Sequence, residues 1–334
     1  MRLKLSTFAQ SAAVLAALAG GLALAVPPPG NGNGNGGSGG SGGTTGGTTG
    51  GTTPSDPYAA LPAFVRMEGV VRDFRARNVA GGHPDFEMTP AQGFGHYAGM
   101  VQDTLDADGK PIFRSTGYKV STQWKDASGQ NIMPGPAKAY IQGRVGDVTG
   151  QMDVNPGGAV TSANSFSQWF RDVPGVNMSA LIPLTLNRIP GTNRYVFDDS
   201  LDTHYAQLEG FFMVNGRLQG ANGGAQGGNK NYHFTYTIDS TFTYRHGQGQ
   251  YFSFKANDDL WVFINGQLVI DLGGVAANTL QRIDLDRLSF LSDGQDARIQ
   301  VFYANRNRPL CNFRMEMSMA MRRVDPPPIT EPFD

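Results

Sequence analysis

The stretch DDLWVFINGQLVI, residues 258–270, decides how this chain folds. An Asn-Gly pair at 265–266 separates two apolar runs, and such a pair is typical of a two-residue type I′ hairpin turn in which both central residues have positive φ. Trp261 and Phe263 point to one face of the first run, and the apolar residues between them point to the other. The sequence therefore predicts a β-hairpin whose first strand is buried on both faces.

Two further segments alternate with a period of two. Phe234, Tyr236 and Ile238 are separated by threonines. Residues 313–321 carry one phenylalanine and then methionine at every second position, with mostly polar residues between them. Alternation of this kind predicts strands. We interpret the methionine stripe as the core face of its strand, because methionine fills irregular apolar space.

Helix signals are scarce. The segment SFSQWFRDV, residues 165–173, fits one helix, with a capping box at Ser165 and Gln168 and apolar side chains on one face. Pro174 and Gly175 would end it. We predict an all-β fold, an antiparallel β-sandwich or barrel with one short helix and long insertions, in a single domain over residues 58–324.

Composition excludes several classes of protein. Among 334 residues, 27 Lys and Arg face 28 Asp and Glu, so the net charge is −1. A near-neutral chain has no electrostatic reason to bind nucleic acid or an anionic membrane. The single cysteine, Cys311, excludes an intramolecular disulfide and a thiolate zinc site. Its thiol is expected to be buried as a small apolar residue or to pair between molecules.

Both ends of the chain differ in composition from the body. Residues 1–25 resemble a secretory signal peptide, with Arg2 and Lys4 before an apolar stretch and a small-residue cleavage site. The alternative is a retained membrane anchor, for which the apolar run is short. Residues 26–57, rich in Gly, Ser, Thr, Asn and Pro, predict a flexible linker, and residues 325–334 a Pro-rich polar tail. We expect a secreted mature chain without a transmembrane segment, either free or associated with the cell surface.

Asp258 and Asp259 are adjacent carboxylates at the start of the predicted hairpin, preceded by Asn257. Neighbouring carboxylates repel, and in a regular strand they would point to opposite faces. One interpretation is a solvated turn before the strand. The other is a cation site, because calcium takes about six to eight oxygen ligands, and the polar loop at 304–312 would supply amide and carbonyl oxygens. Spacing alone leaves both interpretations open.

A second acidic segment is HPDFE, residues 83–87, which places His83, Asp85 and Glu87 at every second position. In a strand they would share one face, as metal binding or catalysis requires. Three polar residues at this spacing in a proline-containing loop also occur by chance, without binding a metal or taking part in catalysis. The sequence has no Gly-x-Ser-x-Gly, His-Glu-x-x-His or phosphate-loop pattern, so we expect that the protein is not an enzyme.

The hairpin segment DDLWVFING at 258–266, followed by DLGG at 271–274, resembles the central signature of fibro-slime domain proteins. Five further segments fit that family in the same order: VRDF at 71–74, HPDFE at 83–87, WFRDVPGVN at 169–177, NYHFT at 231–235 and NFR at 312–314. The resemblance runs from about residue 70 to residue 319, which is most of the chain after the linker.

Fibro-slime domains are related to the lectin-like β-sandwich of anthrax protective antigen, which yeast flocculins also use. The resemblance implies a calcium ion held by an Asp-Asp pair with a cis peptide and by an Asn from a second loop, with sugar hydroxyls as further ligands. Carried onto this sequence, the metal ligands are Asp258, Asp259 and Asn312. Weaker candidates for ligand contact are Asn257, where relatives often have a third Asp, and Arg306, Asn307 and Arg308 in the second loop.

The sequence departs from the family at two places near these residues. Ala276 stands where relatives tend to have His, and Asn305-Arg306-Asn307 stands where they tend to have Glu-Arg-His. These departures bear on the identity of the ligand more than on calcium itself.

Three functions follow as hypotheses. The leading one is a secreted, calcium-dependent carbohydrate-binding or adhesion module that recognises a glycan or extracellular polysaccharide. The alternative is an extracellular structural or signalling matrix protein, in which calcium is purely structural and the partner is a surface protein. An intrinsic hydrolase is the third, and no motif supports it.

Overall fold

The computed structural model describes residues 56–134, 138–158, 160–220 and 229–318, together with the backbone of 321–323. The predicted signal peptide (1–25), almost all of the predicted linker (26–57) and the predicted tail (325–334) lie outside the described residues.

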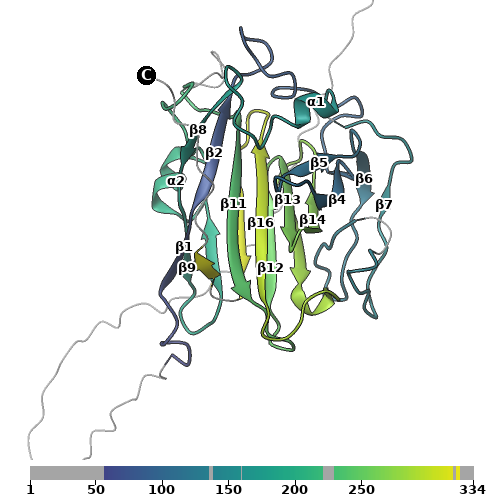
Figure 1. The fold of residues 1–334 in the computed structure, drawn as a ribbon, viewed down its shortest axis with the longest axis vertical. Coiled ribbons are helices and arrows are strands. Elements are labelled where there is room, and N and C mark those ends of the chain that lie inside the picture. Colours follow the sequence, from purple (N-terminus) through teal and green to yellow (C-terminus); the bar gives the residue numbers. More distant parts are fainter. Residues whose placement is uncertain (1–55, 135–137, 159, 221–228, 319–320, 324–334) are drawn as a thin grey trace, which may run out of the picture. The chain divides into compact units, whose positions relative to one another are not determined.

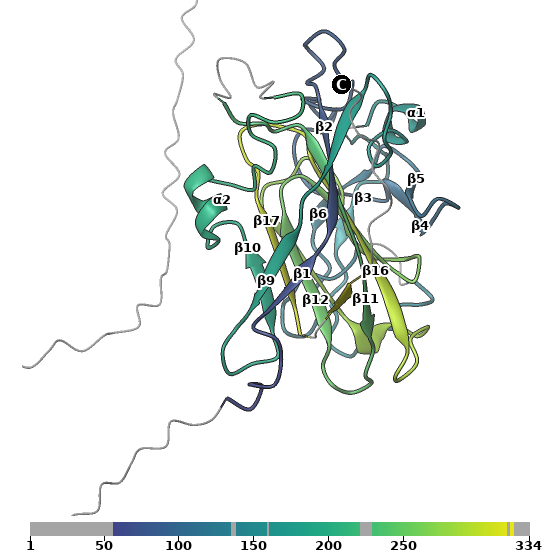
Figure 2. The same cartoon turned by 60° about the vertical axis from the view of Figure 1, so that its left-hand side comes forward.

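Two antiparallel sheets face each other, as Figures 1 and 2 show. The first sheet has the order β1 (Phe64–Met67), β9 (Leu184–Arg188), β10 (Tyr195–Asp198), β17 (Phe313–Met317), β12 (Tyr251–Ala256) and β15 (Thr279–Asp284). The second has the order β5 (Pro111–Phe113), β4 (Val101–Leu105), β14 (Gln267–Leu272), β13 (Asp259–Ile264), β16 (Asp296–Asn305), β11 (Phe234–Thr243), β2 (Gly69–Phe74) and β8 (Asn177–Leu181), with β18 (Met321–Arg323) paired to β11. The predicted antiparallel all-β sandwich is confirmed.

The main core lies between the two sheets and follows the predicted alternation. Phe234, Tyr236 and Ile238 of β11 belong to it, and so do Met315 and Met317 of β17. The methionine stripe is therefore a core face over its described part, which ends before residue 319. Cys311 packs into the same core, and its thiol donates to the carbonyl oxygen of Phe211 at 3.2 Å. Burial raises the pKa of the Cys311 thiol well above its usual value, which favours the buried small residue over an intermolecular disulfide.

A second core covers the outer face of the second sheet. Trp261 and Phe263 of β13 project into it, while Leu260, Val262 and Ile264 face the main core. The predicted hairpin is confirmed, because Asn265 and Gly266 have φ of 47° and 76° and join β13 to β14. The cover comes from the long insertion, which carries the small sheet of β3 (Tyr97–Ala98), β6 (Tyr118–Thr122) and β7 (Gln151–Met152), and from the segment around α1 (Ala163–Phe166).

The helices differ from the prediction. Helix α1 begins at Ala163, because Ser162 is its N-cap and shares a capping box with Ser165, three residues before the predicted box. It ends at Phe166, although Trp169 and Phe170 after it are buried as expected. Two elements were not predicted: α2 (Thr203–Leu208), capped by Asp202, and the 3₁₀ turn η1 (Leu285–Arg287).

Candidate functional site

The predicted site residues converge where β12 crosses into β13 beside the end of β16. Strand β13 pairs with β16 so that Asp259 lies opposite Ala304, which brings residues 257–258 next to the loop at 306–308. The backbone N–H of Asn257 donates to the carbonyl oxygen of Asn312 at 3.0 Å. The cis peptide joins Asn257 to Asp258, one bond before the Asp258–Asp259 bond that the resemblance implied.

Asp258 is a buried carboxylate held by the second loop. Its Oδ2 accepts hydrogen bonds from the backbone N–H groups of Arg306 and Asn307, both at 2.9 Å. Removal from water raises the pKa of Asp258 to about 7, and these two hydrogen bonds only partly offset that burial. A cation beside the carboxylate would favour its charged form.

The two asparagines that adjoin Asp258 each have a buried amide oxygen without a hydrogen-bond partner: Asn257 Oδ1 and Asn307 Oδ1. Their amide nitrogens are both in use. Asn257 Nδ2 donates to the carbonyl oxygen of Ala276 at 2.8 Å, and Asn307 Nδ2 donates to that of Met88 at 3.2 Å. These bonds fix which end of each amide is the oxygen, so both acceptors stay without donors. A buried acceptor without a donor is costly unless a ligand meets it.

Asp259 has a different role from its neighbour. Its Oδ2 accepts from Arg306 Nε at 2.6 Å, and its Oδ1 accepts from the backbone N–H of Gly274 at 2.6 Å. Both side chains of this ion pair have no solvent exposure. The Arg306 guanidinium also lies 4.5 Å from the centre of the Trp169 ring and donates to the carbonyl oxygen of Asp85. Arg306 is thus a structural residue, and a solvent-borne ligand does not reach the guanidinium suggested as a contact.

Asn312 lies next to Asn257, and its amide nitrogen binds a further acid, Asp199. Asn312 Nδ2 donates to Asp199 Oδ2 at 2.9 Å, and the backbone N–H of Phe313 donates to the other oxygen of Asp199 at 3.0 Å. Burial raises the pKa of Asp199, and these donors lower it in part. Asp199 was not predicted from sequence, although it forms a second adjacent acid pair with Asp198.

The HPDFE segment braces this site. Asp85 accepts from Trp169 Nε1 at 2.9 Å and from the backbone N–H of Thr161 at 2.7 Å. Glu87 Oε1 lies 2.9 Å from both His233 Nε2 and Arg308 Nε. These contacts join segments far apart in the chain, so the acids of this segment hold the second loop in place.

The donor set is oxygen-rich but poor in charge. Among the described residues, no three His, Cys, Asp or Glu side chains gather as a metal-binding group. What the loops offer is one carboxylate, Asp258, with two amide oxygens, from Asn257 and Asn307. Calcium accepts this type of ligand, and the two unpartnered oxygens fit it.

Comparisons with known proteins match one part of the chain to a described domain. Residues 216–331 match the sequence model of the PA14 domain. The chain is similar in sequence to three proteins of Dictyostelium discoideum: psiQ, 31% identical over 56% of this chain and 19% of psiQ; psiD, 29% identical over 67% and 36%; and psiC, 33% identical over 47% and 28%. The chain therefore spans roughly a fifth to a third of the length of these relatives. These matches support the protective-antigen-type resemblance, and the fibro-slime name stays a prediction.

Among solved structures, the PA14 domain of the MpAFP antifreeze protein and a PA14 sugar-binding domain from an RTX adhesin are each 13% identical to this chain. Each covers 26% of this chain, and the match takes in 42% and 45% of those chains, at a TM-score of 0.19. Within the described ranges, no helix has the length and apolar character needed to cross a bilayer. The sequence match to the PA14 domain over residues 216–331 includes both loops of the candidate site.

Proposed function

We propose that this protein is an exported carbohydrate-binding module of the PA14 type, which binds its glycan at a calcium ion held by Asn257, Asp258 and Asn307. One observation carries the proposal: two asparagines adjoin the buried Asp258, Asn257 in the chain and Asn307 through its backbone N–H, and each has a buried amide oxygen without a donor. The PA14 match over both loops supports it, as does the description of one related solved domain as sugar-binding. The proposal involves no catalytic residue.

The proposed ligand set is shifted from the one expected from sequence. Asp259 is left out because Arg306 and Gly274 occupy its oxygens. Asn307 takes the place of Asn312 because the Asn307 side-chain oxygen is buried without a donor, whereas that of Asn312 is not among the buried oxygens that lack one. Bound there, calcium would neutralise Asp258 and offer its remaining coordination positions to sugar hydroxyls. With one carboxylate in the set, we expect weaker calcium binding than a site with two would give.

Calcium titration of four proteins tests the assignment. Wild type is compared with Asp258→Asn, Asn307→Ala and the matched variant Asn312→Ala, by calorimetry and thermal melting. A ligand that binds only the folded state at about 100 times its Kd stabilises by about 2.7 kcal/mol. We expect that stabilisation in wild type and Asn312→Ala, and at least a roughly tenfold weaker Kd in the other two. Equal calcium binding in all four would overturn the site, and loss only in Asn312→Ala would restore the ligand set predicted from sequence.

Glycan binding is tested separately, on an array with and without a chelator. Binding that the chelator abolishes supports the proposal, and silence under both conditions contradicts it. One observation favours the alternative, a matrix protein with a purely structural ion: Asn257, Asp258 and Asn307 are only 1%, 5% and 5% exposed. Calcium stabilisation without any glycan binding would select that alternative.

A further inference from the structure

A cavity of about 280 Å³ lies between β15 with η1 and two described stretches of the insertion, residues 124–134 and 138–149. It contains none of the candidate cation-site residues. Trp124, Ile132 and Ile283 contribute apolar surface, while Asp147, Thr149 and Arg287 contribute polar groups. Sites for small molecules are commonly apolar pockets with a few placed polar groups and volumes of about 300–1,000 Å³, so this cavity lies at the small end of that class.

We propose that this cavity is a second binding site, which takes a single sugar ring or a polyol of similar size independently of calcium. Trp124 supplies the flat apolar surface. Its ring packs against the backbone of Gly150, where an added Cβ would lie 2.5 Å from Trp124 Cε3. Glycine at 150 thus lets the half-buried indole lie on the chain and line the cavity.

Arg287 decides the polarity of the ligand. Its side chain is nearly fully buried, and its terminal nitrogens donate to the two oxygens of Asp147 at 2.6 and 2.7 Å. Arg287 lines the cavity together with Asp147 and Thr149. A hydrocarbon ligand would cover these polar groups without hydrogen bonding to them, which is unfavourable. A ligand with hydroxyl groups can hydrogen-bond to them, so the site favours a polyol over a lipid.

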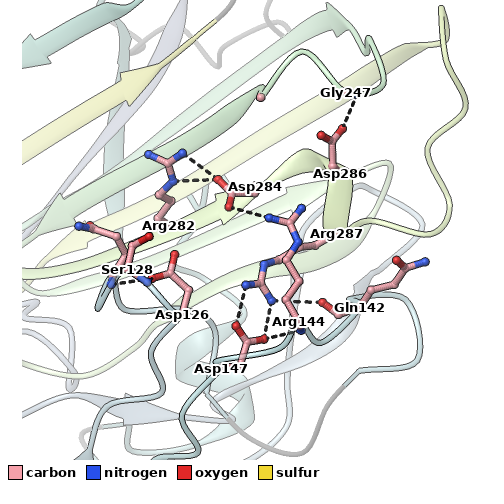
Figure 3. Close-up of polar contacts among 12 residues, drawn as sticks. Asp126, Ser128, Gln142, Arg144, Asp147, Gly247, Arg282, Asp284, Asp286 and Arg287 are labelled. Carbon is pink, nitrogen blue, oxygen red and sulfur yellow. Dashed lines mark hydrogen bonds and ion pairs between the residues drawn. The ribbon is translucent and has the colours of Figure 1, made fainter.

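Residues 142–147, which form one wall of the cavity, are held in place without a ligand (Figure 3). The backbone N–H of Gln142 donates to the carbonyl oxygen of Arg287 at 2.8 Å. The Arg144 side chain reaches Asp284 at 3.3 Å, and its backbone N–H donates to Asp147 at 2.8 Å. Such preorganisation lowers the entropy lost on binding.

The test uses methyl glycosides of glucose, galactose, mannose and N-acetylglucosamine, with anilinonaphthalene sulfonate as an apolar probe. Saturation-transfer NMR and tryptophan fluorescence are recorded in EDTA. Val148 lines the cavity and Val145 lies on the same segment, is fully exposed and does not. Val148→Trp would block the cavity, and Val145→Trp is its matched control.

We expect at least one glycoside to bind in EDTA, with a Kd at least tenfold weaker in Val148→Trp and unchanged in Val145→Trp. Binding should persist in Asp258→Asn, so failure of the calcium proposal leaves this result intact. The proposal is overturned if no glycoside saturates, if only the apolar probe binds, or if Val148→Trp binds like wild type.

Discussion

Asp259 and Arg306 form a buried ion pair whose two side chains have no solvent exposure. A buried pair gains little net stability over apolar residues, but each partner alone is an uncompensated charge in a low dielectric. The pair fixes the end of β16 against the start of β13. It therefore positions the backbone N–H groups of Arg306 and Asn307 that hold Asp258.

Arg306→Met is expected to lower the free energy of unfolding by about 3–5 kcal/mol, because it leaves Asp259 charged and buried. Urea denaturation followed by circular dichroism measures the change. The double variant with Asp259→Asn should recover part of the loss. Arg66→Met is the control, since the Arg66–Glu68 pair is exposed at Arg66 and worth at most about 1 kcal/mol. Similar losses in the two single variants would contradict the argument.

Asp73 makes stability depend on pH. It is fully buried and accepts from Asn231 Nδ2 and the backbone N–H of Gln219, both at 2.8 Å. Burial nevertheless raises the pKa of Asp73 from 3.8 to about 7. The folded state therefore holds a proton that the unfolded state releases near pH 4, so this contribution is complete below pH 4 and is lost as the pH rises through 7.

We expect the contribution of Asp73 to unfolding free energy to fall by roughly 4 kcal/mol between pH 4 and pH 7, at about 1.36 kcal/mol per pKa unit. Asp73→Asn cannot titrate, so its stability should change less over that range than that of wild type. Denaturation midpoints at half-unit pH steps measure the two slopes. Parallel slopes would show that Asp73 is not the titrating group.

At the scale of elements, the β13–β14 hairpin depends on the conformation of its turn. Gly266 has φ of 76°, and a Cβ added there would meet no atom within 4 Å. At position 266, therefore, only the left-handed backbone conformation disfavours a residue with a side chain. Gly274, with φ of 94°, differs because its Cβ would lie 2.5 Å from the Tyr97 ring.

Gly266→Ala is expected to destabilise the protein by about 1–2 kcal/mol, the cost of a left-handed residue with a Cβ. Gly274→Ala should cost more, since a clash adds to the same strain. Gly143→Ala is the control, because that glycine lacks a positive φ and has open space around it. Thermal melting ranks the three, and equal losses would show that the turn conformation is not limiting.

Local patterns predicted the elements that they control. The hairpin followed from Asn265-Gly266, and the two alternating strands from their apolar positions. Helix α1 was misplaced because Ser162 and Ser165 form the box, whereas the apolar face that suggested a longer helix reflects burial of Trp169 and Phe170 in the second core. Helix α2 has no fully buried residue, and only Tyr205 and Leu208 on it pack against the main core, which is too short an apolar pattern to predict a helix.

The sequence located the candidate site but did not determine which side chains form it. Adjacent acids and a polar loop indicated which two segments meet. Which side chains form the site depends on partners distant in the chain. Arg306 forms an ion pair with Asp259, and the Asn312 amide nitrogen donates to Asp199. No local pattern encodes such pairs, so sequence ranked Asn312 above Asn307, and the buried Asn307 oxygen without a donor is visible only in the structure.

At the scale of the whole molecule, the second core protects two of the three tryptophans from solvent. Trp169 and Trp261 have no exposed surface and lie 6.2 Å apart in the second core, whereas Trp124 is half-buried. The three indoles therefore report on different parts of the fold.

Acrylamide should quench a minor part of the fluorescence, the part that comes from Trp124. Trp124→Phe is expected to remove the quenchable component and leave the protected one. Stern–Volmer plots measure both. Substantial quenching in Trp124→Phe would show that the second core is open to solvent.

The sequence match to the PA14 domain begins at residue 216, inside the folded body. Strands β11 and β17 lie inside the matched segment, but the strands that pair with them, β2 and β10, precede residue 216. Recombination that moved residues 216–331 alone into another gene would transfer open strand edges, which favour aggregation. The segment that matches the PA14 domain is therefore smaller than the unit that can be inherited as a folded module.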